Sequence, residues 1–225
     1  MSPLPPKIRA ERNETVVLAL IAGYVDAYGL AKLGTFVSYM SGNTTQAGLS
    51  LGTAVWAKAL PSGVAIVSYV VGSFAGTWLT HTGWRQSRRL ILAAVAVALA
   101  VSPLLEPRSQ SGTIAVLAVA MGLMNAVRTR VGPESVSLTF VTGTLSRMAS
   151  HLALAAHGAP LADKGGPGDS HVQRAKMLAS VWASFFVGAI LSGVLGLWLG
   201  ALSLVPPLAP ILWLAAWPRP LPAER

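Results

Sequence analysis

The feature that most constrains this chain is a series of apolar stretches long enough to cross a lipid bilayer. "LILAAVAVALAVSPLL" (90–105) and "SGTIAVLAVAMGLMNAV" (111–127) contain no charged residue. A crossing helix needs about 20 mostly apolar residues, because the hydrocarbon core is about 30 Å thick. Only 11% of the 225 residues are charged, whereas about 25% is usual in globular chains. The sequence therefore predicts an all-α integral membrane protein whose main partner is the lipid bilayer.

Two polar stretches, "SYMSGNTTQ" (38–46) and "SLTFVTGTLS" (137–146), interrupt the apolar runs and belong to an internal repeat. The matches occur in the same order in both halves: Gly23 with Gly122, Asp26 with Asn125, Gly42 with Gly143, and "SYVVG" (68–72) with "SFFVG" (184–188). A polar stretch of 15 residues, 158–172, has no counterpart in the first half. We predict one membrane domain made of repeats 1–106 and 107–225, with a flexible loop at 158–172.

Each repeat holds four candidate segments, of which the second is polar. They cover roughly 15–34, 37–59, 62–80 and 88–105, then 112–130, 135–157, 176–200 and 201–217. If both polar segments enter and return on one side, fourteen of the 17 Lys and Arg residues lie with the N-terminus and three lie opposite. If all eight segments cross, the division is ten against six, with Arg147 in mid-segment.

Positive residues collect in the cytoplasmic loops of membrane proteins, so the charge distribution favours the first arrangement. It consists of about six transmembrane helices plus two re-entrant or broken polar segments, organised as two inverted three-span repeats. Inverted repeats are common in secondary transporters. Both termini would then be cytoplasmic. Eight full crossings remain the alternative, because mildly apolar segments can cross inside a bundle.

Asp26 is the sharpest candidate for chemistry, since it lies within the first apolar segment, between Tyr24 and Tyr28. A carboxylate in the membrane costs roughly 2.5–3.5 kcal/mol on insertion scales, so it should face a cavity, an ion path or a partner. The functional interpretation is a proton or cation site. The structural alternatives are a helix–helix hydrogen bond and an ion pair with Lys32. Asn125, the residue aligned with Asp26 in the second repeat, is neutral, which argues against a relay of two carboxylates.

The polar motifs supply the other candidate binding residues, which are Gly42, Asn43, Thr44, Asn125, Thr142, Gly143 and Thr144. Irregular backbone at membrane depth persists only where it lines protein or water. The glycines would permit a break, and Asn43 with the threonines (Thr45 included) would cap half-helices whose N-termini favour anions or polar ligands. We expect these half-helices to meet near the midplane and to form a ligand site. Interhelical hydrogen bonding by small polar residues is the alternative.

Small residues recur at every fourth position on two segments: Ser68, Gly72, Gly76 and Thr80 on one, and Ser184, Gly188, Ser192, Gly196 and Gly200 on the other. Such stripes let membrane helices approach closely. We expect them to pack helices within one subunit, with a homo-oligomer interface as the alternative.

Several other functions are disfavoured. The net charge of +9 fits cytoplasmic loops better than nucleic-acid binding. The absence of Cys excludes disulfides, thiolate nucleophiles and Cys-ligated metals. His151 and His157 are six residues apart, which is not the i, i+4 spacing of a metal-binding helix. No nucleotide-binding or nucleophile motif is present, so we expect neither an enzyme nor a metal nor a cofactor.

The ordered motifs resemble the YoaK family of small bacterial membrane proteins, a domain-of-unknown-function family. The residues that carry the resemblance are Asp26-Ala27, Ser41-Gly42-Asn43, Gly122-Leu123-Met124-Asn125-Ala126 and Thr142-Gly143-Thr144-Leu145. The similarity spans residues 14–217, and Met124 stands where the family usually has Gln. The resemblance implies a multi-pass protein of the bacterial inner membrane with about six helices, and it brings no established activity.

Together these features predict a small-solute or ion transporter or channel, with its site between the two polar segments and Asp26 as the coupling residue. The alternative is a non-transporting membrane scaffold or modulator of a partner protein. The sequence does not identify the solute.

Overall fold

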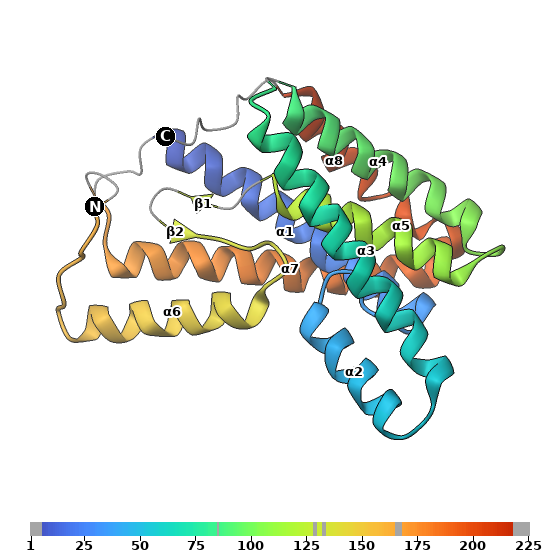
Figure 1. Ribbon diagram of the computed structural model, residues 1–225. Coiled ribbons are helices and arrows are strands. Elements are labelled where there is room, and N and C mark those ends of the chain that lie inside the picture. Colours follow the sequence, from blue (N-terminus) through green and yellow to red (C-terminus); the bar gives the residue numbers. More distant parts are fainter. Residues whose placement is uncertain (1–5, 85, 128–129, 132–133, 165–167, 218–225) are drawn as a thin grey trace.

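The computed structural model describes residues 6–84, 86–127, 130–131, 134–164 and 168–217, and most of them are helical (Figure 1). The elements in chain order are α1 (Pro6–Leu33), α2 (Met40–Gly52), α3 (Trp56–His81), α4 (Ser87–Leu105), α5 (Gln110–Asn125), β1 (Arg130–Val131), β2 (Glu134–Ser135), α6 (Val141–Ala156), α7 (His171–Leu199), the 3-10 helix η1 (Gly200–Leu204) and α8 (Leu208–Ala216). The two short strands form an antiparallel pair that the sequence did not predict.

Four of the described helices are long and apolar enough to cross a membrane, judged by length and composition. They are α1 (from Ile8), α3, α4 and α7, with mean hydropathies of 1.5 to 2.0. Two shorter apolar stretches, Gln110–Asn125 and Leu202–Ala216, accompany them. The chain is thus mainly helical, and its long apolar helices have the length and composition expected of a membrane protein.

The last predicted segment, 201–217, is not one helix. α7 ends at Leu199, Gly200 adopts a left-handed φ of 52°, and a 3-10 turn follows before α8 begins. Pro206 and Pro207 interrupt the backbone hydrogen-bonding pattern, because proline has no N–H to donate. The chain therefore reaches α8 through a tight turn.

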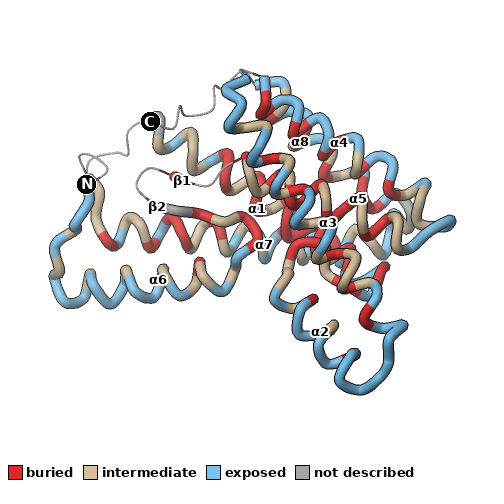
Figure 2. Tube along the Cα trace, in the orientation of Figure 1, coloured by how far each residue is buried: buried red, intermediate tan, exposed pale blue. Residues whose placement is uncertain are grey.

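The main hydrophobic core consists of buried residues that come mostly from α1, α4, α5 and α8 (Figure 2). Beside this core, α1 packs closely against α7, and α3 packs closely against α5. Glycines allow both close approaches. A Cβ atom built on Gly23 would lie 2.0 Å from the carbonyl oxygen of Phe185, and one on Gly188 would lie 2.0 Å from that of Leu20. Gly188 of the second stripe thus packs α7 on α1 within this chain, as predicted, whereas a Cβ on Gly196 or Gly200 would meet no atom within 4 Å.

The second contact repeats the first with the roles of the halves exchanged. A Cβ on Gly72 of α3 would lie 2.2 Å from the carbonyl oxygen of Val119, and one on Gly122 of α5 would lie 2.3 Å from that of Tyr69. In both contacts, the first helix of one half packs against the third helical segment of the other half.

Contacts at the helix ends define the relative directions of α1, α4 and α8. Arg88, at the start of α4, pairs with Glu14 in the first half of α1, with Nε 2.7 Å from Oε1. The hydroxyl of Tyr28, late in α1, donates to Glu106 directly after α4. α1 and α4 therefore run parallel. Arg88 Nη1 also donates to the carbonyl of Trp217, directly after α8, at 3.1 Å, so α8 runs antiparallel to α4.

α5 starts beside the end of α1, where Gln110 Nε2 donates to the Leu33 carbonyl at 2.9 Å. It then returns along α4 after the short connection 106–109. The α3–α5 contact continues from Gly72 against Val119 to Gly76 against Leu123, so these helices run parallel.

α7 runs parallel to α1, because Ile8 and Ala19 of α1 cluster with Met177 and Val181 near the start of α7. Thus α1, α4 and α7 run in one direction, and α3, α5 and α8 run in the other. The connection from α1 to α3 consequently starts and ends on one side of the helix bundle, and the connection from α5 to α7 starts and ends on the opposite side. These connections contain α2 and α6.

Candidate functional site

Asp26 anchors an interior loop in the first half. After α1 ends, residues 34–39 fold back, and the backbone N–H groups of Val37 and Ser38 donate to Asp26 Oδ1 at 2.9 and 2.8 Å. Asp26 is only 4% exposed. Lys32, the partner considered from the sequence, is exposed instead. The carboxylate therefore satisfies buried backbone donors that would otherwise be costly in a membrane.

Asn125 has the same position in the second half. Its Oδ1 accepts from the backbone N–H of Leu138 at 3.3 Å and from the hydroxyl of Ser137 at 3.2 Å. The two residues that the repeat aligns thus bind corresponding loops, one through a carboxylate and the other through a neutral amide. A side-chain oxygen is the shared requirement, whereas the charge is particular to the first half.

Asn43 of α2 also binds the interior loop 34–39, which Asp26 of α1 anchors, and Asn43 is fully buried. Its Oδ1 accepts from the Thr35 hydroxyl at 3.0 Å and from the Phe36 N–H at 3.2 Å, and its Nδ2 donates to the Phe36 carbonyl at 2.7 Å. All of these groups belong to the interior loop 34–39. Asn43 therefore fixes the loop conformation rather than the N-terminus of α2.

Gly42 and Gly143 make room for aromatic rings. A Cβ on Gly42 would lie 2.4 Å from Cδ1 of Tyr39, and one on Gly143 would lie 2.1 Å from Cε1 of Phe140. Neither glycine has a positive φ. The interruptions lie before them, at 34–39 and after α5, so these glycines do not supply the break that the sequence suggested. They let the preceding ring pack on the first helical turn.

The threonines bond within their own helices. The Thr44 hydroxyl donates to the Met40 carbonyl, and the Thr144 hydroxyl donates to the Phe140 carbonyl. Thr44 and Thr142 are exposed, while Thr144 is buried. Neither α2 nor α6 has a side-chain hydrogen bond at its N-cap, so the predicted capping is not observed.

The candidate residues fall into two separate groups. α2 packs on α3, α6 packs on α7, and the two polar helices extend to different sides of the structure (Figure 1). The structure therefore brings Gly42, Asn43 and Thr44 near Asp26, and Thr142, Gly143 and Thr144 near Asn125. It does not bring these groups together, and the expectation that α2 and α6 meet is not fulfilled.

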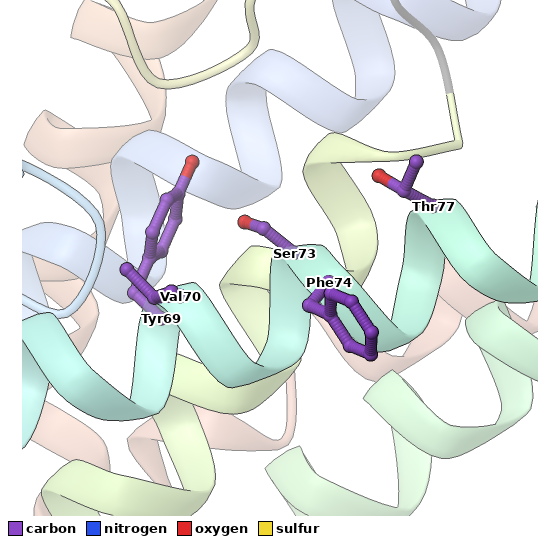
Figure 3. Close-up of a pocket in the computed structure, with 5 residues that line it drawn as sticks. All are labelled: Tyr69, Val70, Ser73, Phe74 and Thr77. Atoms are coloured by element: carbon purple, nitrogen blue, oxygen red, sulfur yellow. The ribbon is translucent and has the colours of Figure 1, made fainter.

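A shallow groove of about 400 Å³ lies along α3 close to the second group. Tyr69, Val70, Ser73, Phe74 and Thr77 line it (Figure 3). The Tyr69 hydroxyl is 3.2 Å from Thr139 Oγ1 in the loop before α6. The Ser73 hydroxyl is buried and has no hydrogen-bond partner within the described part of the chain. The exposed lining of the groove is mostly apolar, and its hydroxyl groups lie toward the protein interior.

The groove residues are not among the candidates predicted from the sequence, although their spacing carries a signal. Tyr69, Ser73 and Thr77 have the same four-residue spacing as the small-residue stripe beside them. The aligned residue in the second half, Phe185, lacks the hydroxyl of Tyr69. Among the described residues, no group of three or more His, Asp or Glu side chains could hold a metal ion.

The apolar helices and their polar interior loops define a polytopic, all-helical membrane protein. The chain belongs to the family described as "Protein of unknown function (DUF1275)", which matches residues 15–217. It is 34% identical to the UPF0700 transmembrane protein RA0705 of Rhizobium meliloti (strain 1021), over 93% of this chain and 90% of that protein. It is 28% identical to the UPF0700 transmembrane protein YoaK of Bacillus subtilis (strain 168), over 62% of this chain and 66% of that protein. No solved structure matches the chain.

Proposed function

We propose that this protein is a small-solute or ion transporter or channel of the bacterial inner membrane, built from two inverted halves. α1, α3, α4, α5, α7 and α8 cross the membrane, while α2 and α6 enter and return. The observation that carries the proposal is the pair of interior loops before α2 and α6, which a buried carboxylate and its amide counterpart hold inside the bundle. Irregular backbone at membrane depth is a feature of transporter binding sites.

The first helix of each half packs against the third helical segment of the other half, and this exchange of helices supports inverted repeats. α1 contacts α7 through Gly23 and Gly188, and α5 contacts α3 through Gly122 and Gly72. The sequence repeat aligns Gly23 with Gly122 and Gly72 with Gly188, so each contact is the counterpart of the other. α1 and α5 run in opposite directions, as halves with an odd number of crossings require.

The charge distribution supports cytoplasmic termini. With six crossings, fourteen Lys and Arg residues lie on the side of the N-terminus and three lie on the opposite side. The apolar outer faces contact lipid, as the exposed Phe74 and Trp78 of α3 and the exposed Leu197 and Trp198 of α7 illustrate.

Removing the charge of Asp26 tests the proposal. Asp26→Asn keeps a side-chain oxygen for the amides of Val37 and Ser38, in the manner of Asn125, so we expect the thermal stability to be retained. It removes the group that can carry a proton, so we expect proton flux to fall to the level of protein-free vesicles. The measurement uses proteoliposomes that contain a pH-sensitive dye, with a potassium diffusion potential as the driving force.

Two variants control this experiment. Asp163→Asn makes the same chemical change in an exposed loop and should leave flux unchanged. Asp26→Leu removes the acceptor and should destabilise the protein, since an unsatisfied buried donor costs about 1–3 kcal/mol. Equal flux in Asp26→Asn and the parent protein would exclude Asp26 from the transport path.

Single cysteines at exposed positions test the number of crossings, because the chain has no native Cys. With six crossings, an impermeant thiol reagent reaches Ala31→Cys and Thr53→Cys from one side and Thr82→Cys and Ala162→Cys from the other. With eight crossings, Ala31 and Thr82 would instead share a side, as would Thr53 and Ala162. Labelling in sealed and opened vesicles distinguishes these patterns, and the second pattern would refute the proposed topology.

A further inference from the structure

A hydrogen-bonded pair of histidines joins α6 to α7. Nδ1 of His151 lies 2.8 Å from Nδ1 of His171. His171 is 8% exposed, and the side chain of His151 is 13% exposed. The residues are 20 positions apart in sequence and meet because the connection 157–170 turns α7 back along α6. We infer that this pair is a proton-sensitive latch, which holds α6 on α7 when both imidazoles are neutral and opens when they are protonated.

The surrounding contacts determine where the protons lie in the closed pair. His151 Nε2 is 3.1 Å from Oε1 of Glu134, which also accepts from Arg174 Nη1 at 2.8 Å. A carboxylate paired with Arg174 is an acceptor, so His151 carries its proton on Nε2 and donates it to Glu134. Nδ1 of a neutral His151 is then an acceptor, and Nδ1–H of His171 donates to it.

The surroundings of His171 Nε2 make it unfavourable to add a proton to the closed histidine pair. It is buried and has no hydrogen-bond partner within the described ranges. One added proton can go to either histidine. In both cases, the hydrogen bond between the two Nδ1 atoms persists only if His171 also carries a hydrogen on Nε2. That N–H would be buried without an acceptor, which is costly. A second added proton would place two N–H groups face to face and remove the bond altogether.

Several charged groups surround the pair. Asp169, in the turn before α7, accepts from Arg174 Nη2 at 2.8 Å and from Arg174 Nε at 3.1 Å. Arg147 lies one helical turn before His151 on α6. Glu134 and Asp169 attract a proton, whereas Arg174 and Arg147 repel it, and both carboxylates are already bound by Arg174.

The remaining packed element, α1, carries Arg9, Glu11 and Arg12 beside Ile8, which packs near the start of α7. The closed arrangement thus disfavours added protons, so lowering the pH favours its opening. No corresponding pair joins α2 to α3, because α2 contains no histidine.

The latch can be tested by measuring the distance between α6 and α7. Spin labels on Leu154→Cys and Val172→Cys, both on exposed side chains, report that distance in liposomes. We expect one short distance at about pH 8 and a longer, broader distribution at about pH 5. In His171→Gln or His151→Gln the distribution should be the same at both pH values.

His157→Gln is the matched control, since His157 is exposed on the same polar connection and bonds the carbonyl of Ala153. It should keep the full pH response. The inference is refuted if the parent protein shows no response between these pH values. It is also refuted if both His171→Gln and His151→Gln respond like the parent. Because the experiment measures a distance and not transport, its outcome is independent of the proposed function.

Discussion

Gly188→Ala is expected to destabilise the folded protein strongly, whereas Gly193→Ala on the same helix should leave it intact. A Cβ at position 188 would lie 2.0 Å from the carbonyl oxygen of Leu20 and 3.0 Å from the backbone nitrogen of Tyr24. These are backbone atoms of a helix and cannot rotate away, so α1 and α7 must separate along their contact. We expect a loss of about 3 kcal/mol or more, at the upper end of the cost of overpacking.

Gly193 provides the control because its Cβ would meet no atom within 4 Å. Alanine is favoured over glycine within a helix by roughly 0.5–1 kcal/mol, so Gly193→Ala should be neutral or slightly stabilising. The same contrast should hold on α3 between Gly72→Ala and Gly63→Ala. Thermal unfolding followed by size-exclusion chromatography measures both pairs. Similar melting temperatures for Gly188→Ala and Gly193→Ala would contradict the close contact.

Arg88→Met is expected to destabilise the protein by about 3–5 kcal/mol, the usual cost of removing one partner from a buried ion pair. The side chains of Arg88 and Glu14 are 3% and 1% exposed, and Arg88 also binds the carbonyl of Trp217. The substitution would leave the Glu14 carboxylate buried without this cation. It would also release the end of α8 from the start of α4.

The double variant Glu14→Gln with Arg88→Met should recover much of this loss, because it buries no charge. Arg89→Met is the matched control, since Arg89 is the next residue and is exposed. Chemical unfolding in detergent micelles compares the four proteins. If Arg88→Met and Arg89→Met have equal stability, the buried pair does not contribute as proposed.

The sequence predicted the features that depend on local composition. Apolar length located α1, α3, α4 and α7, since a crossing helix must be both long and apolar. Gly72, Gly76 and Gly188 of the small-residue stripes lie in close helix contacts, as predicted. The alignment of Asp26 with Asn125 identified two side chains that now prove to bind corresponding loops.

Features that depend on long-range packing could not be predicted in this way. Hydrophobic periodicity does not indicate that Arg88, interpreted as a cytoplasmic charge marker, would be buried against Glu14. It also gives no indication that Glu134, His151 and His171 would meet, because they come from three different elements. The role of Gly42 was missed for a different reason, since hydrophobic periodicity does not show that the rings of Phe36 and Tyr39 fold onto the first turn of α2.

The exchange of helices between the halves imposes an order on biosynthesis. α1 leaves the ribosome more than one hundred residues before α7, the helix against which it packs. During that interval its buried face must be protected by lipid, by the insertion machinery or by temporary contacts. The first half expressed alone lacks α7, so a second copy of that half would have to cover the buried face of α1.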